Sequence, residues 1–242
     1  ILLCRGLWAS AETVYTVDCN GGGDFRTIQA CFDALPSKPA EWRTVRIMPG
    51  VYREKVTLDV YKDKVRILGD EMAETRIVWG DYAGKVVDGR ELTTYDSYTM
   101  SVQADDVYLD CLTVENDAGR VGQAVALETR GDRIWIDGCR LIGNQDTFFT
   151  KGYVSRVFVT DSYIEGTTDF IVRSSAIRTP SLLATTFRAY MSRIVISREP
   201  PTSFSALRSC CSSVRRSIAR PTVSSRPLRP PSATNADSSS PA

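Results

Sequence analysis

The feature that most constrains the fold is a repeat of 22 or 23 residues in the middle of the chain. Gln145 follows Gln123 by 22 positions, and Asp169 follows Asp146 by 23. A parallel β-helix spends roughly 20 to 25 residues on each coil, and its neighbouring strands lie about 4.8 Å apart. Residues one repeat apart in the sequence are therefore expected to lie side by side on successive coils.

Short apolar strands recur along the same part of the chain. Alternating triplets begin at Val107, Ile134 and Val157, and each is followed by a second apolar group and a Gly or Asn turn. None of these strands can bury its apolar face alone, which favours a solenoid over the alternative of a β-sandwich with chance spacing. We expect stacked parallel strands over residues 40–171, with these side chains pointing inward: Val107, Leu109, Ile134, Ile136, Val157 and Val159.

The N-terminal part suggests two features that precede the coils. Residues 27–36 place apolar side chains at helical spacing and end on Pro36, which predicts a short amphipathic helix capping the first coil. Residues 1–12 are expected to be an N-terminal extension or the remnant of a signal peptide, because Ala9 and Ala11 form a small-x-small pattern.

The composition excludes several kinds of chemistry. The chain contains no histidine, which excludes Ser-His-Asp and Cys-His nucleophiles and zinc sites that depend on imidazole. Its seven cysteines show no metal-binding spacing, and buried thiols are expected. Cys111 and Cys139 are expected on adjacent coils, where an oxidising compartment would let them pair. We expect no metal, no cofactor and no membrane span.

The composition changes abruptly at about Val172. Residues 173–242 carry eleven Arg against two acids and no Gly or Lys, whereas residues 1–172 have a net charge of −8. This favours a coil region that ends at residue 172, followed by an irregular tail that is disordered or read out of frame. The alternative is a natural basic linker that binds an acidic polymer.

Two acids and two amides form the candidate catalytic group. A carboxylate that attacks an ester carbonyl creates an oxyanion, which the side-chain amides of Gln123 and Gln145 can stabilise. Two neighbouring carboxyl groups such as Asp146 and Asp169 can divide into one protonated and one ionised group, because like charges raise one pKa. This division supplies a nucleophile and a proton donor without histidine.

Other residues near these acids have weaker assignments. Phe148 and Phe149 are candidates for stacking on a sugar ring, although alternation along a strand buries one of them. Four further acids are interpreted as solvated turn residues: Asp105, Asp106, Asp137 and Asp161.

Residues 13–171 resemble a pectin methylesterase. The resemblance rests on five motifs in family order, GDFRTIQ at 23–29, PGVYREKV at 49–56, GQAVAL at 122–127, GNQDT at 143–147 and GTTDFI at 166–171. It implies a right-handed parallel β-helix that hydrolyses methyl esters of galacturonate units in pectin and releases methanol. It further implies that Asp169 is the nucleophile and Asp146 the general acid and then base. Gln123 and Gln145 would be the oxyanion donors and Thr94 a substrate contact.

The resemblance stops near Ile171. The family continues with more coils and a Leu-Gly-Arg-Pro-Trp motif, which is absent from residues 172–242. We therefore expect a truncated copy that is weakly active or inactive, with a catalytically dead pectin-binding β-helix as one alternative. A pectate-lyase-like enzyme is the other. The expected partner is pectin, without nucleic acid or membrane, and the chain is expected to be a secreted monomer.

Overall fold

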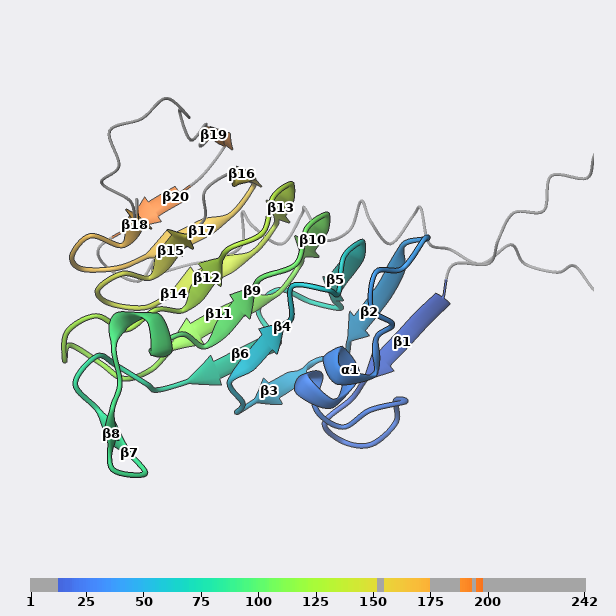
Figure 1. Ribbon diagram of the computed structural model, residues 1–242, viewed down its shortest axis with the longest axis horizontal. Coiled ribbons are helices and arrows are strands. Elements are labelled where there is room, and N and C mark those ends of the chain that lie inside the picture. Colours follow the sequence, from blue (N-terminus) through green and yellow to red (C-terminus); the bar gives the residue numbers. More distant parts are fainter. Residues whose placement is uncertain (1–12, 152–154, 175–187, 193–194, 198–242) are drawn as a thin grey trace, which may run out of the picture.

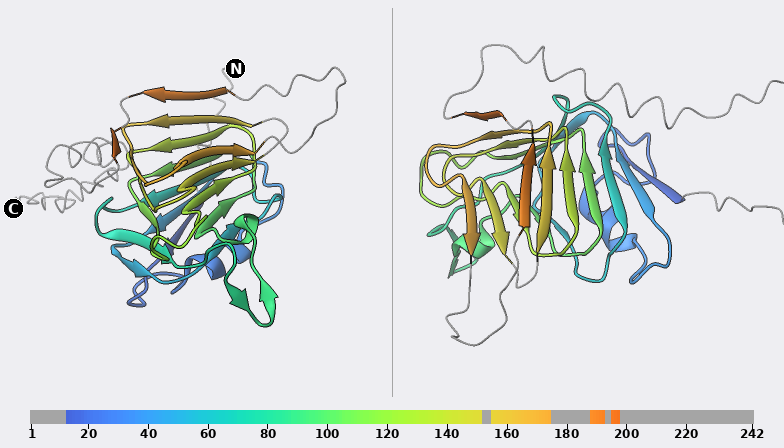
Figure 2. Two further views of the ribbon diagram at one scale, coloured as in Figure 1. Left: turned by 90° about the vertical axis from the view of Figure 1, so that its left-hand side faces the viewer. Right: turned by 90° about the horizontal axis from the view of Figure 1, so that it is seen from above.

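Three parallel sheets wrap around one apolar core in the computed structural model, which describes residues 13–151, 155–174, 188–192 and 195–197 (Figure 1). Each complete coil contributes one strand to each sheet, and the strands of successive coils lie side by side (Figure 2). This arrangement is a parallel β-helix, as the repeat predicted.

The first sheet, here called sheet A, begins at the N-terminal end of the stack. Its strands, in spatial order, are β1 (Thr13–Val17), β2 (Arg43–Ile47), β5 (Val65–Gly69), β10 (Val107–Asp110), β13 (Ile134–Asp137), β16 (Arg156–Thr160) and β19 (Arg188–Ser192).

The other two parallel sheets follow the same order of coils. Sheet B contains β3 (Gly50–Tyr52), β6 (Thr75–Trp79), β11 (Thr113–Asn116), β14 (Arg140–Ile142), β17 (Tyr163–Glu165) and β20 (Val195–Ser197). Sheet C contains β4 (Val56–Leu58), β9 (Met100–Val102), β12 (Leu127–Thr129), β15 (Phe148–Lys151) and β18 (Ile171–Ser174).

The core consists of inward-pointing ladders. Val107, Ile134 and Val157 are register neighbours on three successive coils of sheet A. They and the other side chains predicted to point inward, Leu109, Ile136 and Val159, are at most 1% exposed. The predicted ladders are therefore confirmed, and the period of two along each strand explains why the intervening residues face outward.

Helix α1 (Ile28–Ala34) closes the N-terminal end of the core. Thr27 caps the helix by accepting a hydrogen bond from the Ala30 N–H. The Glu54 carboxylate accepts the backbone N–H groups of Ile28 (2.8 Å) and Gln29 (3.0 Å), so the first turn has partners for its free donors. The helix packs against β4 and buries Ile28, Cys31 and Phe32 in the core. No helix in the described part of the chain is long and apolar enough to cross a membrane.

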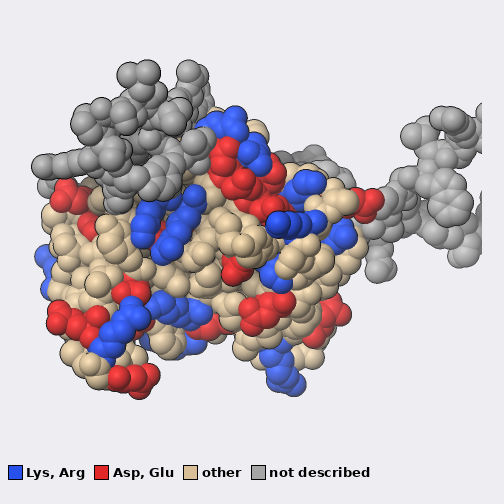
Figure 3. Space-filling model, viewed as in Figure 1, with Lys and Arg blue, Asp and Glu red and all other residues tan. Residues whose placement is uncertain are grey.

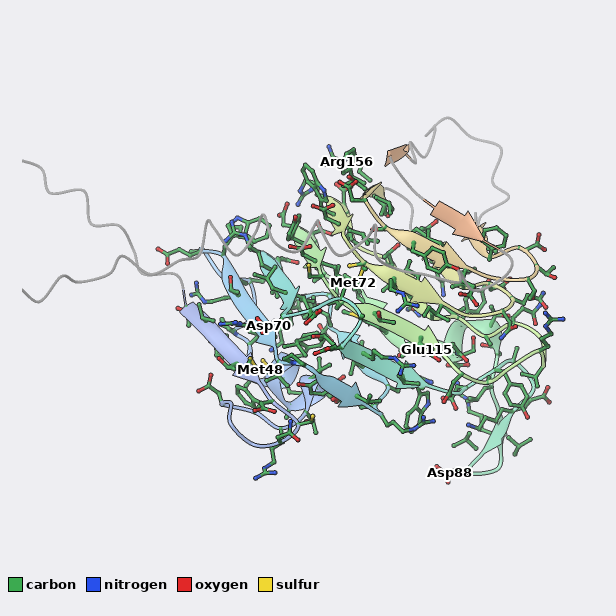
Figure 4. All side chains as sticks on the ribbon, turned by 180° about the vertical axis from the view of Figure 1, so that it is seen from behind. Met48, Asp70, Met72, Asp88, Glu115 and Arg156 are labelled. Carbon is green, nitrogen blue, oxygen red and sulfur yellow. The ribbon has the colours of Figure 1, made fainter. Side chains whose placement is uncertain are left out.

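One insertion leaves the repeat between β6 and β9. It contains the antiparallel hairpin β7 (Val86–Val87) and β8 (Arg90–Glu91) and the 3-10 helix η1 (Thr94–Asp96). Asp88 and Gly89 have φ values of 50° and 76° and form the two-residue turn that such hairpins favour. Figure 4 shows Asp88 at the tip of this projecting hairpin.

Ion pairs link successive coils on the outside of sheet A. Arg133 donates from Nη2 to Asp106 Oδ2 (2.8 Å), and Arg156 donates from Nε to Asp132 Oδ1 (2.9 Å). Arg156, labelled in Figure 4, is thus tied to the coil before its own. These acids lie on the surface but are paired, so Asp106 is not simply a solvated turn residue.

Two further expectations can be compared with the structure. Cys139 is a buried free thiol, as expected, and the pairing with Cys111 that an oxidising compartment would allow is not formed. Asp137 is not a solvated turn acid, because it ends β13 beside Asp110 and accepts a hydrogen bond from the Tyr108 hydroxyl (3.1 Å). Burial and the charge of Asp137 raise the pKa of Asp110 to about 7.

The stack of coils also runs further than the boundary predicted at residue 172. β18 crosses that boundary and pairs with β15, and β19 and β20 pair with β16 and β17. The rest of the predicted irregular tail, including residues 198–242, lies outside the described residues, as does the predicted extension at residues 1–12.

The ladder arrangement predicts a sharp contrast between two valine truncations in sheet A. Val107→Ala removes two methyl groups from a position that is 1% exposed, and should lower the free energy of unfolding by about 2 kcal/mol. Val14→Ala makes the same deletion where the side chain is 51% exposed, and should cost less than about 0.5 kcal/mol. Urea unfolding followed by circular dichroism measures both values, and equal losses would contradict the assigned core.

Candidate active site

The predicted site residues meet at the corner between sheets B and C. Gln123 pairs with Gln145 on the next coil, and Gln145 pairs with Thr168 on the coil after that. Asp146 and Asp169 each follow this row by one residue. The Asp146 N–H donates to the Thr168 carbonyl at 3.4 Å, so the two aspartates occupy equivalent places on adjacent coils.

Both aspartates have the left-handed backbone conformation, with φ values of 62° at Asp146 and 42° at Asp169. This conformation costs free energy for most residues other than glycine, although Asp tolerates it through local hydrogen bonding. In both turns it changes the chain direction just before a strand of sheet C begins. A left-handed aspartate also occurs at corners without amide neighbours, such as Asp161 with φ 47°, so the conformation alone does not mark the site.

Two glycines allow the tight corner that holds the acids. A Cβ added to Gly143 would lie 2.8 Å from Thr147 Oγ1, and one added to Gly166 would lie 2.1 Å from Phe170 Cβ. Real Cβ atoms do not approach other atoms this closely, so each position requires glycine because of close packing. Thr147 is fixed by a hydrogen bond from Oγ1 to the Glu165 carbonyl (2.8 Å), which crosses from sheet C to sheet B.

The two carboxyl groups have different surroundings. Asp146 is 7% exposed, whereas the Asp169 side chain is exposed. Burial, and in second place the neighbouring charge of Asp169, raise the pKa of Asp146 to about 6. A buried acid with a raised pKa beside an accessible one is the division expected for a proton donor and an ionised partner.

The two glutamines flank the carboxyl pair with partly exposed side chains. Within the part of the chain that the structure describes, neither carboxamide makes a hydrogen bond to another residue. Each NH₂ group can therefore donate to a ligand at this corner. The backbone of the row is fixed independently, because the Ala124 N–H donates to the Gln145 carbonyl at 3.0 Å.

Alternation along the strand was expected to bury one of the two phenylalanines, and Phe148 is that residue. It points into the core and is 1% exposed, so its ring is not accessible to a substrate. Phe149 points out of sheet C but is 4% exposed. Tyr95 of η1 lies across it, with ring centroids 5.9 Å apart in an edge contact. Phe149 therefore supports Tyr95, and does not present an open ring to a sugar.

Tyr95 is the residue that the sequence interpretation missed. Its ring is 41% exposed, and it places η1, and hence Thr94, over the outer face of sheet C. Thr94 is partly buried, and its carbonyl accepts hydrogen bonds from Ser97. The sequence feature that could have pointed to Tyr95 is its position directly after Thr94, which the resemblance already assigned as a substrate contact.

A buried amide joins the insertion to the segment that follows Gln123. Asn116 Nδ2 lies 2.9 Å from the Asp81 carbonyl oxygen and 3.0 Å from those of Ser97 and Val125. The Ala83 N–H also donates to the Gln123 carbonyl at 2.9 Å. The insertion is thus fixed against the site and is not a free loop.

Asp81 is held by two lysines at the base of this insertion. Its carboxylate accepts hydrogen bonds from Lys55 (2.9 Å) and Lys85 (2.8 Å). Burial acts to raise the pKa of Asp81, but the hydrogen bonds from Lys85 and Lys55 outweigh burial and lower it. This acid is therefore an ionised structural group and not a second proton donor. Among the described residues, no cluster of three or more His, Cys, Asp or Glu is arranged to hold a metal.

Fold and site together define a parallel β-helix protein with a carboxyl pair flanked by two carboxamides. The sequence profile of the pectinesterase family matches residues 14–183. The chain therefore belongs to the pectinesterase family.

Relatives and solved structures agree with this membership. Pectinesterase QRT1 of Arabidopsis thaliana is 37% identical over 170 residues, covering 67% of this chain and 44% of that protein. Pectinesterase 2.2 of Solanum lycopersicum is 35% identical over 159 residues, covering 65% of this chain and 28% of that protein. The chain thus spans less than half the length of these relatives.

Two solved structures share the fold over most of the chain. The pectin methylesterase from carrot has a TM-score of 0.66 at 26% identity, covering 79% of this chain and 55% of that one. A pectin methylesterase in complex with hexasaccharide VII has a TM-score of 0.67 at 25% identity, covering 81% of this chain and 58% of that one.

Replacing Asp146 by a neutral residue should increase the stability of the fold in a pH-dependent way, because the pKa of Asp146 is raised. Because the folded pKa of about 6 exceeds the ordinary value of 3.8, stability is lost progressively as pH rises from about 4 to 6, and the loss is complete above pH 6. Asp146→Asn should therefore leave the free energy of unfolding nearly unchanged at pH 4 and raise it at pH 8, by up to about 3 kcal/mol.

Asp132→Asn is the control of opposite sign for that experiment. The hydrogen bond from Arg156 holds the pKa of Asp132 well below its usual range, so this replacement should lower stability at pH 8. Urea unfolding at pH 4 and pH 8 measures both variants. A gain for Asp146→Asn that is the same at both pH values would contradict the proposed environment.

Proposed function

We propose that this protein is a carboxylic ester hydrolase that removes methyl esters from galacturonate units of pectin. The observation that carries the proposal is the asymmetric carboxyl pair, in which a buried Asp146 with a raised pKa lies one coil from an exposed Asp169. Membership of the pectinesterase family and the likeness to a pectin methylesterase bound to a hexasaccharide support the choice of substrate.

In the first step the ionised Asp169 carboxylate attacks the ester carbonyl carbon. The carbonyl oxygen becomes an oxyanion, to which the amide groups of Gln123 and Gln145 donate. Protonated Asp146 gives its proton to the departing methoxide oxygen, so methanol leaves and an acyl-enzyme anhydride with Asp169 remains. The burial of Asp146 serves this step, because it keeps the proton on the donor at a higher pH than an exposed carboxyl group would.

In the second step Asp146, now ionised, acts as a base. It takes a proton from a water molecule, whose oxygen attacks the acyl carbon of the substrate. The same two glutamines stabilise the second oxyanion, and its collapse releases galacturonic acid, which loses its remaining proton to the solvent, and regenerates ionised Asp169. Asp146 is protonated again at the end, so the pair returns to its starting state.

A pectin-binding β-helix without turnover is the second candidate. It is favoured by the absence of the Leu-Gly-Arg-Pro-Trp motif from residues 172–242, because the resemblance assigns that Arg to contact with the nucleophile. Methanol release from methyl-esterified pectin separates the two functions. Products that absorb in the ultraviolet and require calcium would instead indicate a lyase. We further propose that the chain acts as a monomer outside the cell, where pectin occurs.

The mechanism predicts that Asp169→Asn abolishes methanol release from methyl-esterified pectin, because an amide cannot act as the nucleophile. Asp161→Asn is the matched control, since Asp161 has a similar left-handed conformation at another corner, and should retain turnover. Gln123→Ala should lower kcat by roughly 10²-fold as an oxyanion donor is lost. Turnover by Asp169→Asn close to that of the unmodified chain would refute the assignment of the nucleophile.

The mechanism also predicts the alkaline side of the pH profile. Since Asp146 must be protonated for the first step and its pKa is raised to about 6, kcat/KM should fall about tenfold per pH unit well above pH 6. Initial rates of methanol release between pH 4 and 9 test this. A profile that stays flat from pH 6 to 9 would contradict the role of Asp146 as the acid.

A further inference from the structure

Lys151 is a cation on the face of sheet C that follows the site. It ends β15, the strand that begins two residues after Asp146. Along this strand Phe148 and Thr150 are buried. Phe149 and Lys151 alternate with them and contact Tyr95 on the outer face of sheet C. The Lys151 ammonium nitrogen lies 3.8 Å from the centroid of the Tyr95 ring, and the side chain is partly exposed.

The position of this ammonium group is fixed more strongly than that of a typical surface lysine. Contact between a cation and an aromatic face is worth about 0.5–1 kcal/mol at exposed sites. Tyr95 is itself held by its edge contact with Phe149. The ammonium group is therefore ordered before any ligand arrives, which lowers the entropy lost on binding.

The charge of Lys151 is not neutralised by the described part of the chain. No carboxylate among the described residues forms an ion pair with Lys151. Its neighbour one coil earlier is different, because Arg130 lies 3.0 Å from the buried carboxylate of Glu128. Of these two adjacent cations, Lys151 is the one with a charge available to an anion.

The face shown in Figure 3 has, over its described residues, no broad basic surface that could recognise an acidic polymer. On the face shown in Figure 3, basic and acidic side chains are interspersed. Residues 1–172 carry a net charge of −8 and residues 173–242 one of +9, so the whole chain, at +1, exerts little long-range attraction on a polyanion. Binding of a galacturonate carboxylate therefore depends on individual cations next to the site.

We propose that Lys151 binds the carboxylate of a de-esterified galacturonate unit, while the ester to be cleaved lies at Asp146 and Asp169. The inference rests on the proposed function and specifies its substrate as partly de-esterified pectin. The unit at Lys151 must be a free acid, because a methyl ester has no charge to pair with the ammonium group. Each cleavage creates such a free acid, so the product of one turnover improves the binding of the next segment.

The alternative is that Lys151 only supports Tyr95. In that case Lys151→Gln should weaken the binding of de-esterified and methyl-esterified oligomers alike, by displacing Tyr95. A carboxylate contact has a different result, because only the charged oligomer should be affected. Lys151→Arg keeps the charge and the aromatic contact, and should restore most of the binding.

The test is equilibrium binding of two oligogalacturonate hexamers, one fully de-esterified and one fully methyl-esterified, by calorimetry at low salt. Lys151→Gln should lower the affinity for the de-esterified hexamer about fivefold, the upper part of the range for an exposed ion pair. Its affinity for the methyl-esterified hexamer should stay within about twofold. The difference should shrink in 0.5 M NaCl, because salt screens exposed charges.

Lys38→Gln is the matched control. Lys38 also lies over an aromatic ring, with its nitrogen 5.2 Å from the centroid of Tyr61, in the segment between α1 and β2. This variant should bind both hexamers as the unmodified chain does. A thermal unfolding temperature within about 2 °C of that of the unmodified chain confirms that each variant is folded.

The outcomes separate this proposal from the proposed function. Equal losses for both hexamers, or no loss for either, would overturn the role of Lys151 even if methanol is released. An unmodified chain that releases methanol but does not bind the de-esterified hexamer would overturn it as well. A selective loss in a chain that releases no methanol would support Lys151 and refute the esterase activity.

Discussion

The in-register stacking of parallel strands is the interaction on which the rest of the structure depends. Backbone hydrogen bonds join each coil to the next at a spacing of about 4.8 Å, and inward ladders such as Val107, Ile134 and Val157 hold the register through burial. A slip of one residue would turn every apolar side chain outward. Because the register is fixed, residues far apart in sequence meet reliably, and Asp146 and Asp169 come together without any contact designed for them alone.

The corner between sheets B and C brings the candidate catalytic residues together. Left-handed turns at Asp146 and Asp169 change the chain direction, and the close packing around Gly143 and Gly166 leaves no room for a side chain. The corner buries Asp146 more than Asp169, and this burial raises the pKa of Asp146. The difference in burial between the two carboxyl groups therefore arises from their positions in the solenoid and does not require a histidine.

The repeat allowed the fold to be predicted because solenoid contacts are nearly local in sequence. A spacing of 22 or 23 residues places Gln123, Gln145 and Asp169 on neighbouring coils, and alternation within each strand predicts which side chains point inward. The capping helix followed from its apolar spacing for the same reason. These features depend on periods that can be read directly from the sequence.

Features outside the repeat could not be predicted in this way. Tyr95 covers Phe149 from an insertion whose path no period describes, and Asn116 reaches three carbonyl groups from separate segments. The pairing of Asp137 with Tyr108 also depends on outward-facing side chains, whose surroundings the alternation does not specify. Strands β19 and β20 lie in a segment whose composition gave no sign of coils.

The insertion between β6 and β9 has a consequence for how such a molecule can vary. It leaves a coil after the sheet B strand β6 and rejoins the same coil at the sheet C strand β9, and β4 of the preceding coil still pairs with β9 in register. Its length and sequence can therefore change without shifting a single ladder, provided that the buried anchors of Asn116 and Asp81 remain. The coils keep their register while the hairpin and η1 vary in sequence. Substrate specificity can therefore change in this insertion with little effect on folding.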